Sequence, residues 1–357
     1  MERVLVTGAG GFIGRHVIRQ LVGRSYRVRA TDLPGVDLRY SLELGAEVAT
    51  GDLLDYQFAS DAAEGMDGVV HLAAAFDLGL PRERLLSTNI GTTVNACRAA
   101  ARAGARIFIQ YSTCDVFGLK RKGPTAEDEP KKPRCAYSLS KLYSELVAMG
   151  IMRSEGLPVA IVRPSFVYGP GALYTARSFM LLPALLACYV DSIPLPAGGP
   201  RTSTTHVGDM AAATIAVLEA GDGAAGETFN VVDDSDMCAH EFLKAIFEPF
   251  GIGCSGELGI PWSVIEGAGR LGELLPLRAF APIDRFLAKR WDRVIIENGL
   301  VPMLSPKLDR DFLGFLYGEH YYTNDRMKSL GWEPRYRTFS DGWPETVQWY
   351  RENVYIP

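Results

Sequence analysis

The sequence lacks the features that mark several large classes of protein. Its six cysteines form no Cys-x-x-Cys pair, so neither a disulfide scaffold nor a cysteine zinc site is indicated, and a reducing compartment fits best. Positive charge is not in excess, because 37 Lys and Arg stand against 42 Asp and Glu. This balance argues against nucleic acid as a partner, since phosphate binding needs clustered cations.

Long hydrophobic runs are also missing. The longest mostly apolar stretch, residues 179–190, is too short to span a bilayer. The first strand-like run begins at residue 4, which leaves no room for a signal peptide. We therefore expect a cytoplasmic protein.

The first two-thirds of the chain alternates short β-prone runs with stretches of helical spacing. Ile13, Val17 and Leu21 fall at i, i+4 and i+8, on one face of a helix, and residues 95–103 are rich in Ala. This alternation predicts an α/β fold with a doubly wound parallel sheet, the Rossmann arrangement. The β-prone runs are residues 4–6, 28–30, 48–49, 69–71, 107–109 and 229–232.

The rhythm breaks after residue 171. Pro and Gly cluster in residues 194–200, and residues 252–320 are rich in apolar side chains without clean alternation. We expect residues 1–171 to form a dinucleotide-binding domain, to which residues 202–235 return. Residues 172–201 and 236–357 would form a smaller, mixed substrate-binding part. Residues 120–134 mix both charges and are typical of a solvated surface loop.

A glycine-rich turn follows the first β-prone run and opens the first helical stretch. Gly8 permits a tight turn, Gly11 lets backbone N–H groups approach a pyrophosphate, and Gly14 allows close packing of helix on strand. The helix N-terminus, which begins near Phe12 and Ile13, adds partial positive charge for phosphates. In this context the pattern predicts a dinucleotide site.

Two acidic residues stand at the ends of the next β-prone runs. Asp32 would hydrogen-bond the adenosine ribose hydroxyls and repel a 2′-phosphate, and no Arg follows it directly, so NAD is favoured over NADP. Asp52 follows the third run, beside Leu53. It either faces the adenine or serves as an ordinary loop carboxylate.

A phenol and an ammonium stand four residues apart at Tyr137 and Lys141. On a helix both would lie on one face. The Lys141 charge, with the positive nicotinamide of oxidised NAD, would lower the pKa of Tyr137 and fit it to take a proton from a substrate hydroxyl. Ser112 and Thr113 follow the fifth β-prone run, at the sheet edge where ligands bind. Either hydroxyl could hold the substrate oxygen, or it could cap the strand end.

Together these motifs resemble the extended short-chain dehydrogenase/reductase superfamily, also called the NAD-dependent epimerase/dehydratase family. They stand in the family's order over residues 1–235, and Leu330-Gly331-Trp332-Glu333-Pro334 near the end is similar too. The other matching motifs are Thr-Gly-x-x-Gly-x-x-Gly at 7–14, His-Leu-Ala-Ala at 71–74, Asn-Ile-Gly-Thr at 89–92, Tyr-x-x-x-Lys at 137–141 and Arg-Pro-Ser-Phe-Val-Tyr-Gly-Pro at 163–170.

The resemblance implies roles for individual residues. Tyr137 would be the catalytic acid/base, Lys141 would bind the nicotinamide ribose and tune Tyr137, and Thr113 would orient the substrate hydroxyl. It also implies a homodimer formed through a helix bundle. Further cofactor contacts implied by the matching motifs are Leu72, Ala73, Ala74, Asn89, Pro164, Phe166 and Val167.

Departures from the family pattern narrow the chemistry. Sugar-nucleotide dehydratases carry an Asp-Glu pair directly after the catalytic Thr, where this chain has Cys114 and Asp115, so 4,6-dehydration is disfavoured and we expect these two residues to contact substrate. Many sugar-nucleotide enzymes hold an Asn for the diphosphate where Phe166 stands, and a phenyl ring cannot hydrogen-bond a phosphate. The segment around Phe166 is instead similar to the branch of 3β-hydroxysteroid and sterol-4-carboxylate dehydrogenases.

One basic residue and one histidine complicate this interpretation. Arg201 stands near the place of a diphosphate-binding Arg, with one extra residue in the spacing; it either binds an anionic group of the substrate or solvates a loop. His206 and Asp209 are expected to cap and pack the following helix. No metal site is expected, because no second His stands at ligand spacing.

The leading hypothesis is an NAD-dependent oxidoreductase that interconverts a secondary alcohol and a ketone on a bulky, largely apolar substrate of the steroid, sterol or terpenoid kind. Apolar loops of residues 252–320 would then contact a membrane surface, where such substrates partition. The alternatives are a sugar-nucleotide epimerase with tightly held NAD and a non-catalytic NAD-binding scaffold. The intact Thr113, Tyr137 and Lys141 argue against the scaffold.

Overall fold

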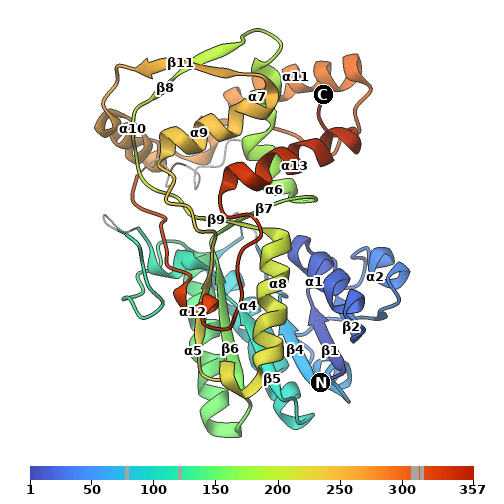
Figure 1. Ribbon diagram of the computed structural model, residues 1–357. Coiled ribbons are helices and arrows are strands. Elements are labelled where there is room, and N and C mark those ends of the chain that lie inside the picture. Colours follow the sequence, from blue (N-terminus) through green and yellow to red (C-terminus); the bar gives the residue numbers. More distant parts are fainter. Residues whose placement is uncertain (77–79, 120–122, 307–312, 314–316) are drawn as a thin grey trace.

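A parallel sheet organises the molecule. The computed structural model describes residues 1–76, 80–119, 123–306, 313 and 317–357. Within these residues seven strands form one sheet in the order β10-β6-β5-β4-β1-β2-β3 (Figure 1). The predicted doubly wound α/β class is confirmed. The strands are β1 (Arg3–Thr7), β2 (Arg27–Asp32), β3 (Glu47–Thr50), β4 (Gly68–His71), β5 (Ile107–Tyr111), β6 (Val159–Pro164) and β10 (Thr228–Val231).

Helices cover both faces of this sheet, so its central strands are buried along their whole length. Val4 and Val6 of β1 pack toward the face that carries α1 and α8, whereas Leu5 packs toward the opposite face. Val17 and Leu21 of α1 are buried, as the helical spacing predicts. One face carries α1 (Phe12–Gly23) and α8 (Val207–Ala220), and the other carries α3 (Tyr56–Ala63), α4 (Arg82–Arg102) and α5 (Ala136–Glu155). The short α2 (Arg39–Glu43) precedes β3.

The strand order reverses between β1 and β4. From β1 the chain first builds outward through β2 and β3, and then returns to place β4 on the other side of β1. Ligands of open α/β sheets bind outside the carboxyl ends of strands at such a reversal. The glycine turn after β1 and the segment after β4 both lie there.

The remaining elements form a second region beyond the carboxyl ends of the sheet (Figure 1). Its core holds Trp291, Trp343 and Tyr350. Two small parallel pairs of strands, β7 with β9 and β8 with β11, lie outside all the β-prone runs predicted from sequence. The elements are β7 (Phe166–Tyr168), β8 (Ser192–Pro196), β9 (Thr204–His206), β11 (Gly253–Leu258), α6 (Leu173–Phe179), α7 (Leu181–Leu186), α9 (Ala239–Phe247), α10 (Trp262–Leu274), α11 (Ala281–Asn298) and α13 (Phe339–Glu352). The short α12 (Asp325–Lys328) instead packs against β10 at the edge of the large sheet. The 3₁₀ turns that lie wholly within the described residues are η1 (Cys114–Phe117), η2 (Gly221–Ala224), η3 (Glu248–Phe250) and η4 (Leu277–Ala279).

Two stretches differ from the sequence expectation or lie partly outside the described residues. Residues 252–320 form β11, α10 and α11, although 307–312 and 314–316 lie outside the described residues. In the charged loop 120–134, residues 120–122 lie outside as well. The interpretation of this loop as fully solvated is wrong for Thr125 and Glu127, which are buried. The Glu127 carbonyl accepts a hydrogen bond from Arg163, and this contact draws the loop inward.

Within the part of the chain that the structure describes, no helix is both long and apolar enough to cross a membrane.

Candidate active site

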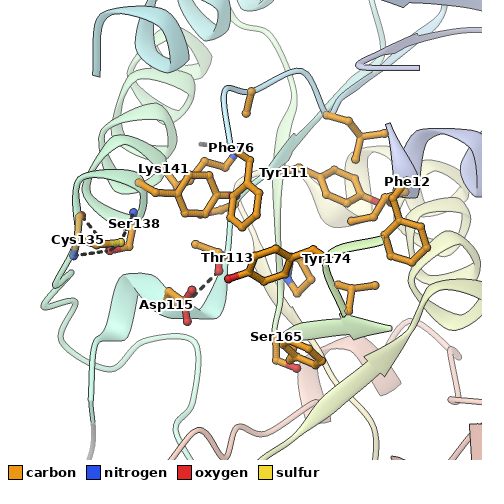
Figure 2. Close-up of a pocket in the computed structure, with 18 of the residues that line it drawn as sticks. Phe12, Phe76, Tyr111, Thr113, Asp115, Cys135, Ser138, Lys141, Ser165 and Tyr174 are labelled. Atoms are coloured by element: carbon orange, nitrogen blue, oxygen red, sulfur yellow. Dashed lines mark hydrogen bonds between the residues drawn. The ribbon is translucent and has the colours of Figure 1, made fainter. Parts of the chain in front are cut away.

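A cavity of about 810 Å³ opens at the reversal point of the sheet. The glycine turn after β1, the segments after β4, β5 and β6, and the first turns of α5 all contribute to its walls (Figure 2). Sequence-predicted residues that line it are Gly8, Gly11, Phe12, Ile13, Gly14, Leu72, Ala74, Thr113, Asp115, Tyr137, Lys141, Pro164, Phe166 and Val167.

The glycine turn leaves no space for side chains. Gly8 adopts a φ of +67°, and a Cβ placed there would lie 2.8 Å from the Ala73 backbone nitrogen. A Cβ at Gly14 would lie 2.4 Å from the Gly8 carbonyl oxygen. Gly11 precedes α1 and offers no side-chain cap, so the first amides of α1 remain for a ligand. This cradle fits the pyrophosphate of a dinucleotide.

Asp32 stabilises the same turn. Its Oδ2 accepts a hydrogen bond of 2.9 Å from the Gly10 amide, and its Oδ1 accepts one of 2.8 Å from Leu33. The carboxylate therefore stands beside the cradle rather than among the residues that line the cavity.

Asp52 and Leu53 also lie outside the cavity lining. The Asp52 carboxylate accepts a hydrogen bond from the Leu54 amide, which is the role of a loop carboxylate. Leu53 is buried against α3 and α4.

The Tyr137–Lys141 pair begins α5 and faces the cavity, as its spacing predicts. One turn later Glu145 forms a buried ion pair with Arg163 of β6, with Oε2 and the Arg163 guanidinium nitrogen 2.7 Å apart. On the other side of α5, the Asn89 amide donates to the Ser140 hydroxyl at 2.9 Å. These contacts fix α5 against β6 and α4.

The protein's own groups raise the pKa of Tyr137. Burial is the largest cause, followed by the nearby Asp115 and Cys135. The protein's own groups thus act against the predicted lowering of this pKa, which depends on Lys141 together with the positive nicotinamide of oxidised NAD and stays a prediction. Burial also lowers the pKa of Lys141 to about 8, although the Glu145 carboxylate acts to raise it. Burial weakens the very charge that was expected to act on Tyr137.

Thr113 and Asp115 stand together at the end of β5. The Asp115 amide donates to the Thr113 hydroxyl oxygen at 3.2 Å, which begins η1 (Figure 2). Burial raises the pKa of Asp115, while His320 and the hydrogen bond from Thr113 act to lower it. Both side chains line the cavity beside Tyr137.

Cys114 does not contact the cavity, which corrects its prediction as a substrate-binding residue. The turn of η1 points its side chain into the core, where it is fully buried and its Sγ donates to the Arg163 carbonyl at 3.2 Å. Burial raises the pKa of this thiol well above its ordinary value. The neighbouring residues Cys114 and Asp115 thus face opposite sides, the core and the cavity.

Phe76 bridges two tyrosine rings at the cavity. Phe76 meets it edge to face with ring centroids 4.8 Å apart, and Phe76 meets Tyr174 in the same way at 5.6 Å. Figure 2 shows Phe76, Thr113 and Tyr174 pointing into one space. Phe166 packs edge to face on Phe179 at 4.9 Å, deeper in the second region.

Sequence reasoning did not identify Phe76, Tyr174 or His320 as site residues. Phe76 lies on the segment that follows β4, so its place beyond a strand end was a usable signal. Tyr174 begins α6, and His320 lies in a region without periodicity. Their approach to the cavity depends on tertiary packing.

Three further predicted residues stand outside the described lining. Ala73 lies behind the glycine turn, where its amide donates to Thr7 Oγ1 at 3.2 Å. Asn89 orients the segment after β4 by accepting from the Ala75 amide at 2.7 Å. Arg201 is half exposed and pairs with Asp236 at 3.4 Å.

His206 and Asp209 serve the helix that follows them, as predicted. The His206 ring accepts a hydrogen bond from the Gly208 amide at the start of α8. Asp209 accepts from the Arg335 and Tyr336 amides and so ties α8 to the chain near its end.

Comparisons with known proteins agree with this geometry. The model of the NAD dependent epimerase/dehydratase family matches residues 4–231. A dTDP-glucose 4,6-dehydratase of Streptomyces griseus is 31% identical over 272 residues, which cover 70% of this chain and 78% of that protein. A 3β-hydroxysteroid dehydrogenase/Δ5→4-isomerase of Mycobacterium tuberculosis is 26% identical over 354 residues, covering 95% and 88%.

A solved structure shares the fold over nearly the whole chain. The UDP-glucuronic acid 4-epimerase of Bacillus cereus, in complex with NAD, superposes with a TM-score of 0.69 at 21% identity and covers 98% of this chain and 99% of its own. The family match spans more than half of the chain, and the cavity carries the cradle that such a cofactor needs. This protein is therefore an enzyme of the NAD-dependent epimerase/dehydratase family, with NAD as its cofactor.

Proposed function

We propose that the enzyme interconverts a secondary alcohol and a ketone on a bulky, largely apolar substrate, such as a steroid, sterol or terpenoid. Residues 1–171, with the return at 202–235, would hold NAD. Residues 172–201 and 236–357 would shape the substrate side. The branch of 3β-hydroxysteroid dehydrogenases serves as the model for this activity.

Tyr137 is the proton-transfer residue in this proposal. Its raised pKa keeps the phenol protonated, which suits it to donate a proton to a ketone oxygen during reduction. Thr113 lines the same cavity and would share the substrate oxygen. NAD, when bound, supplies the hydride donor or acceptor and, when oxidised, a positive charge.

Lys141 binds the nicotinamide ribose in this proposal and adds its charge beside Tyr137. With a pKa of about 8 it is mostly an ammonium at neutral pH. In the direction of alcohol oxidation, this ammonium and the cofactor charge together would offset the burial that disfavours tyrosinate.

The observation that carries the proposal is the aromatic wall at the reaction centre. Phe76 contacts both the Tyr137 ring and the Tyr174 ring, where a sugar would need hydroxyl partners. Apolar ligand surface buried there contributes roughly 25 cal/mol per Å². Among the described residues of the lining, Arg134 is paired with Glu273 at 3.0 Å, so its charge is already compensated. A diphosphate would lose its hydration at a site with few free cations.

The polar end of the cavity gives the substrate one more contact. Asp115, His320 and Ser203 line it together. The Ser112 hydroxyl and the Tyr322 phenol are also buried there, without a hydrogen-bond partner within the described residues. This end suits a second polar group on an otherwise apolar molecule.

A sugar-nucleotide epimerase with tightly held NAD is the second candidate. The comparisons favour it, because sugar-nucleotide enzymes are more numerous than sterol enzymes among the relatives. In that case one carbon would be oxidised and reduced again without net release of NADH. The two candidates differ in the ligand and in net turnover.

We also expect a homodimer through α4 and α5. These helices lie side by side on one face of the sheet. Tyr143 and Leu146 of α5 are exposed large hydrophobic residues on that face.

A thermal-shift titration with NAD present separates the two candidates. Steroid ketones and alcohols are expected to raise the melting temperature with increasing concentration, whereas UDP- and dTDP-sugars are not, because a ligand stabilises the native state by an amount that grows with the logarithm of its concentration over Kd. Phe76→Ser should remove the steroid effect. Concentration-dependent stabilisation by a nucleotide sugar, with none from any steroid, would reverse the two candidates.

A further inference from the structure

Helix α10 exposes its apolar face instead of burying it. Val264, Leu271 and Leu275 share one side of the helix, because about 3.6 residues make a turn. Leu271 is 65% exposed and Leu274 is 80% exposed. An amphipathic helix of a globular protein ordinarily turns this side to the core.

The opposite side of α10 faces the protein. Gly269 is buried, and Glu273 lines the cavity and pairs with Arg134 at 3.0 Å. The helix thus separates the cavity from the exposed apolar side chains. Its orientation is fixed by these contacts, so the exposed side is a built feature of the fold.

The exposed apolar residues continue past the end of α10 into the first turns of α11. Ile283 and Phe286 are half exposed, and Phe286 is 59% exposed beneath the Arg290 guanidinium at 5.4 Å. We call the whole set the late apolar surface. Its members are Val264, Leu271, Leu274, Leu275, Ile283 and Phe286.

Positive charge borders this surface. Residues 276–290 contain four basic side chains, Arg278, Arg285, Lys289 and Arg290, against the single acid Asp284. Apolar residues flanked by Lys and Arg are the composition of helices that lie in a membrane interface. Anionic headgroups attract each such cation near the surface.

The basic residues also indicate which kind of partner can cover the late apolar surface. A second copy of the chain, related by a two-fold axis, would bring the same basic residues face to face and repel itself. An anionic lipid surface complements both the apolar and the basic part. We propose that the late apolar surface docks the enzyme on membranes that carry anionic lipids, with the cavity behind α10. This inference stands on exposure and charge and does not depend on the identity of the substrate.

Vesicle co-sedimentation tests this docking. The full chain is mixed with vesicles of phosphatidylcholine alone or of equal parts of phosphatidylcholine and phosphatidylglycerol. We expect binding to the anionic vesicles that weakens with salt. Leu271→Glu combined with Leu274→Glu should weaken partitioning roughly tenfold or more, because two apolar side chains lose their insertion. Arg278→Glu combined with Lys289→Glu should remove the preference for anionic vesicles.

The matched control is Leu42→Glu combined with Leu54→Glu, two exposed leucines on the far side of the molecule near α2 and β3. This control should bind vesicles like the wild type, and all variants should keep NAD binding. Absence of wild-type binding, or equal binding by the Leu271/Leu274 variant, would overturn the proposal. So would a Leu271/Leu274 variant that loses self-association in sedimentation equilibrium but keeps vesicle binding.

Discussion

The central sheet and the helices α10 and α11 treat apolar side chains in opposite ways. Ile107, Phe108 and Ile109 of β5 are completely buried, whereas Leu274 of α10 is 80% exposed. The apolar residues of the sheet therefore hold the fold together, whereas the exposed apolar residues of α10 and of the first turns of α11 are available for contact outside the chain.

The polar contacts of α5 and α10 differ in the same way, because those of α5 are buried and those of α10 are exposed. The site residues that begin α5 are held by a buried ion pair and by packing on both sides. The polar contacts of α10 are exposed pairs such as Arg270–Glu266. We therefore expect substitutions of the buried groups around α5 to affect catalysis and stability strongly, and substitutions on the exposed side of α10 to affect them weakly.

The largest effect is expected at Tyr137. Tyr137→Phe keeps the ring and its contact with Phe76 but removes the proton-transfer oxygen, so kcat should fall by about 10²–10⁴-fold while NAD still binds. Steady-state rates and NAD titration measure both quantities. Tyr189→Phe, at an exposed position outside the cavity lining, is the matched control and should keep full activity. A Tyr137→Phe variant with more than about a tenth of the wild-type rate would exclude Tyr137 as the acid/base.

The next effect contrasts two arginines in ion pairs. Arg163→Met leaves the buried Glu145 carboxylate without its partner and should lower the free energy of unfolding by about 3–5 kcal/mol. Arg270→Met removes an exposed partner of Glu266 and should change it by less than about 1 kcal/mol. Chemical denaturation of both variants gives the comparison. Equal losses of unfolding free energy in the two variants would show that the buried ion pair stabilises the fold no more than the exposed one.

A pH titration examines Lys141. Because burial lowers its pKa to about 8, the side chain is an ammonium below that pH and becomes neutral above it. NAD affinity should therefore fall as pH rises through about 8, by roughly tenfold or more, as a charge-assisted hydrogen bond is lost. The Lys141→Met variant should bind NAD more weakly and without this pH dependence. A flat wild-type profile between pH 6.5 and pH 9.5 would refute the assigned role.

The smallest effect is expected at Asp32. The wild type should prefer NAD to NADP. In Asp32→Ala the ratio of kcat/KM with NAD to kcat/KM with NADP should fall about tenfold, because the variant lacks the carboxylate that would bind the ribose hydroxyls and repel a 2′-phosphate. Measuring kcat/KM with both cofactors decides this. The Asp32 carboxylate also accepts a hydrogen bond from the Gly10 amide. Asp32→Asn is therefore a second variant, which removes the charge but keeps an oxygen that can accept this hydrogen bond. Preference of the wild type for NADP would contradict the interpretation.

The sheet and the glycine turn could be predicted from sequence because their causes are local. Gly8 and Gly14 are required by close backbone contacts within a few residues or one strand away. The spacing of Val17 and Leu21 indicates which side of α1 is buried. Tyr137 and Lys141 face one cavity because both stand on the first turns of one helix.

Other features depend on contacts between distant segments. Cys114 and Asp115 are neighbours in sequence, yet the turn of η1 sends one into the core and the other into the cavity. The pKa of Tyr137 depends on how deeply the fold buries it and on Asp115, which spacing along a helix does not show. The exposed side of α10 follows from its packing against the cavity wall, because periodicity shows a stripe but not which way it faces.

The most direct measurement of the central claim is turnover of NAD or NADH, followed by absorbance, with a panel of steroid and terpenoid alcohols and ketones beside UDP- and dTDP-sugars. Our account predicts net formation or consumption of NADH with at least one apolar substrate, abolished in Tyr137→Phe, and none with the nucleotide sugars. Conversion of a nucleotide sugar to its epimer or dehydrated product, with no turnover of any apolar alcohol or ketone, would contradict it.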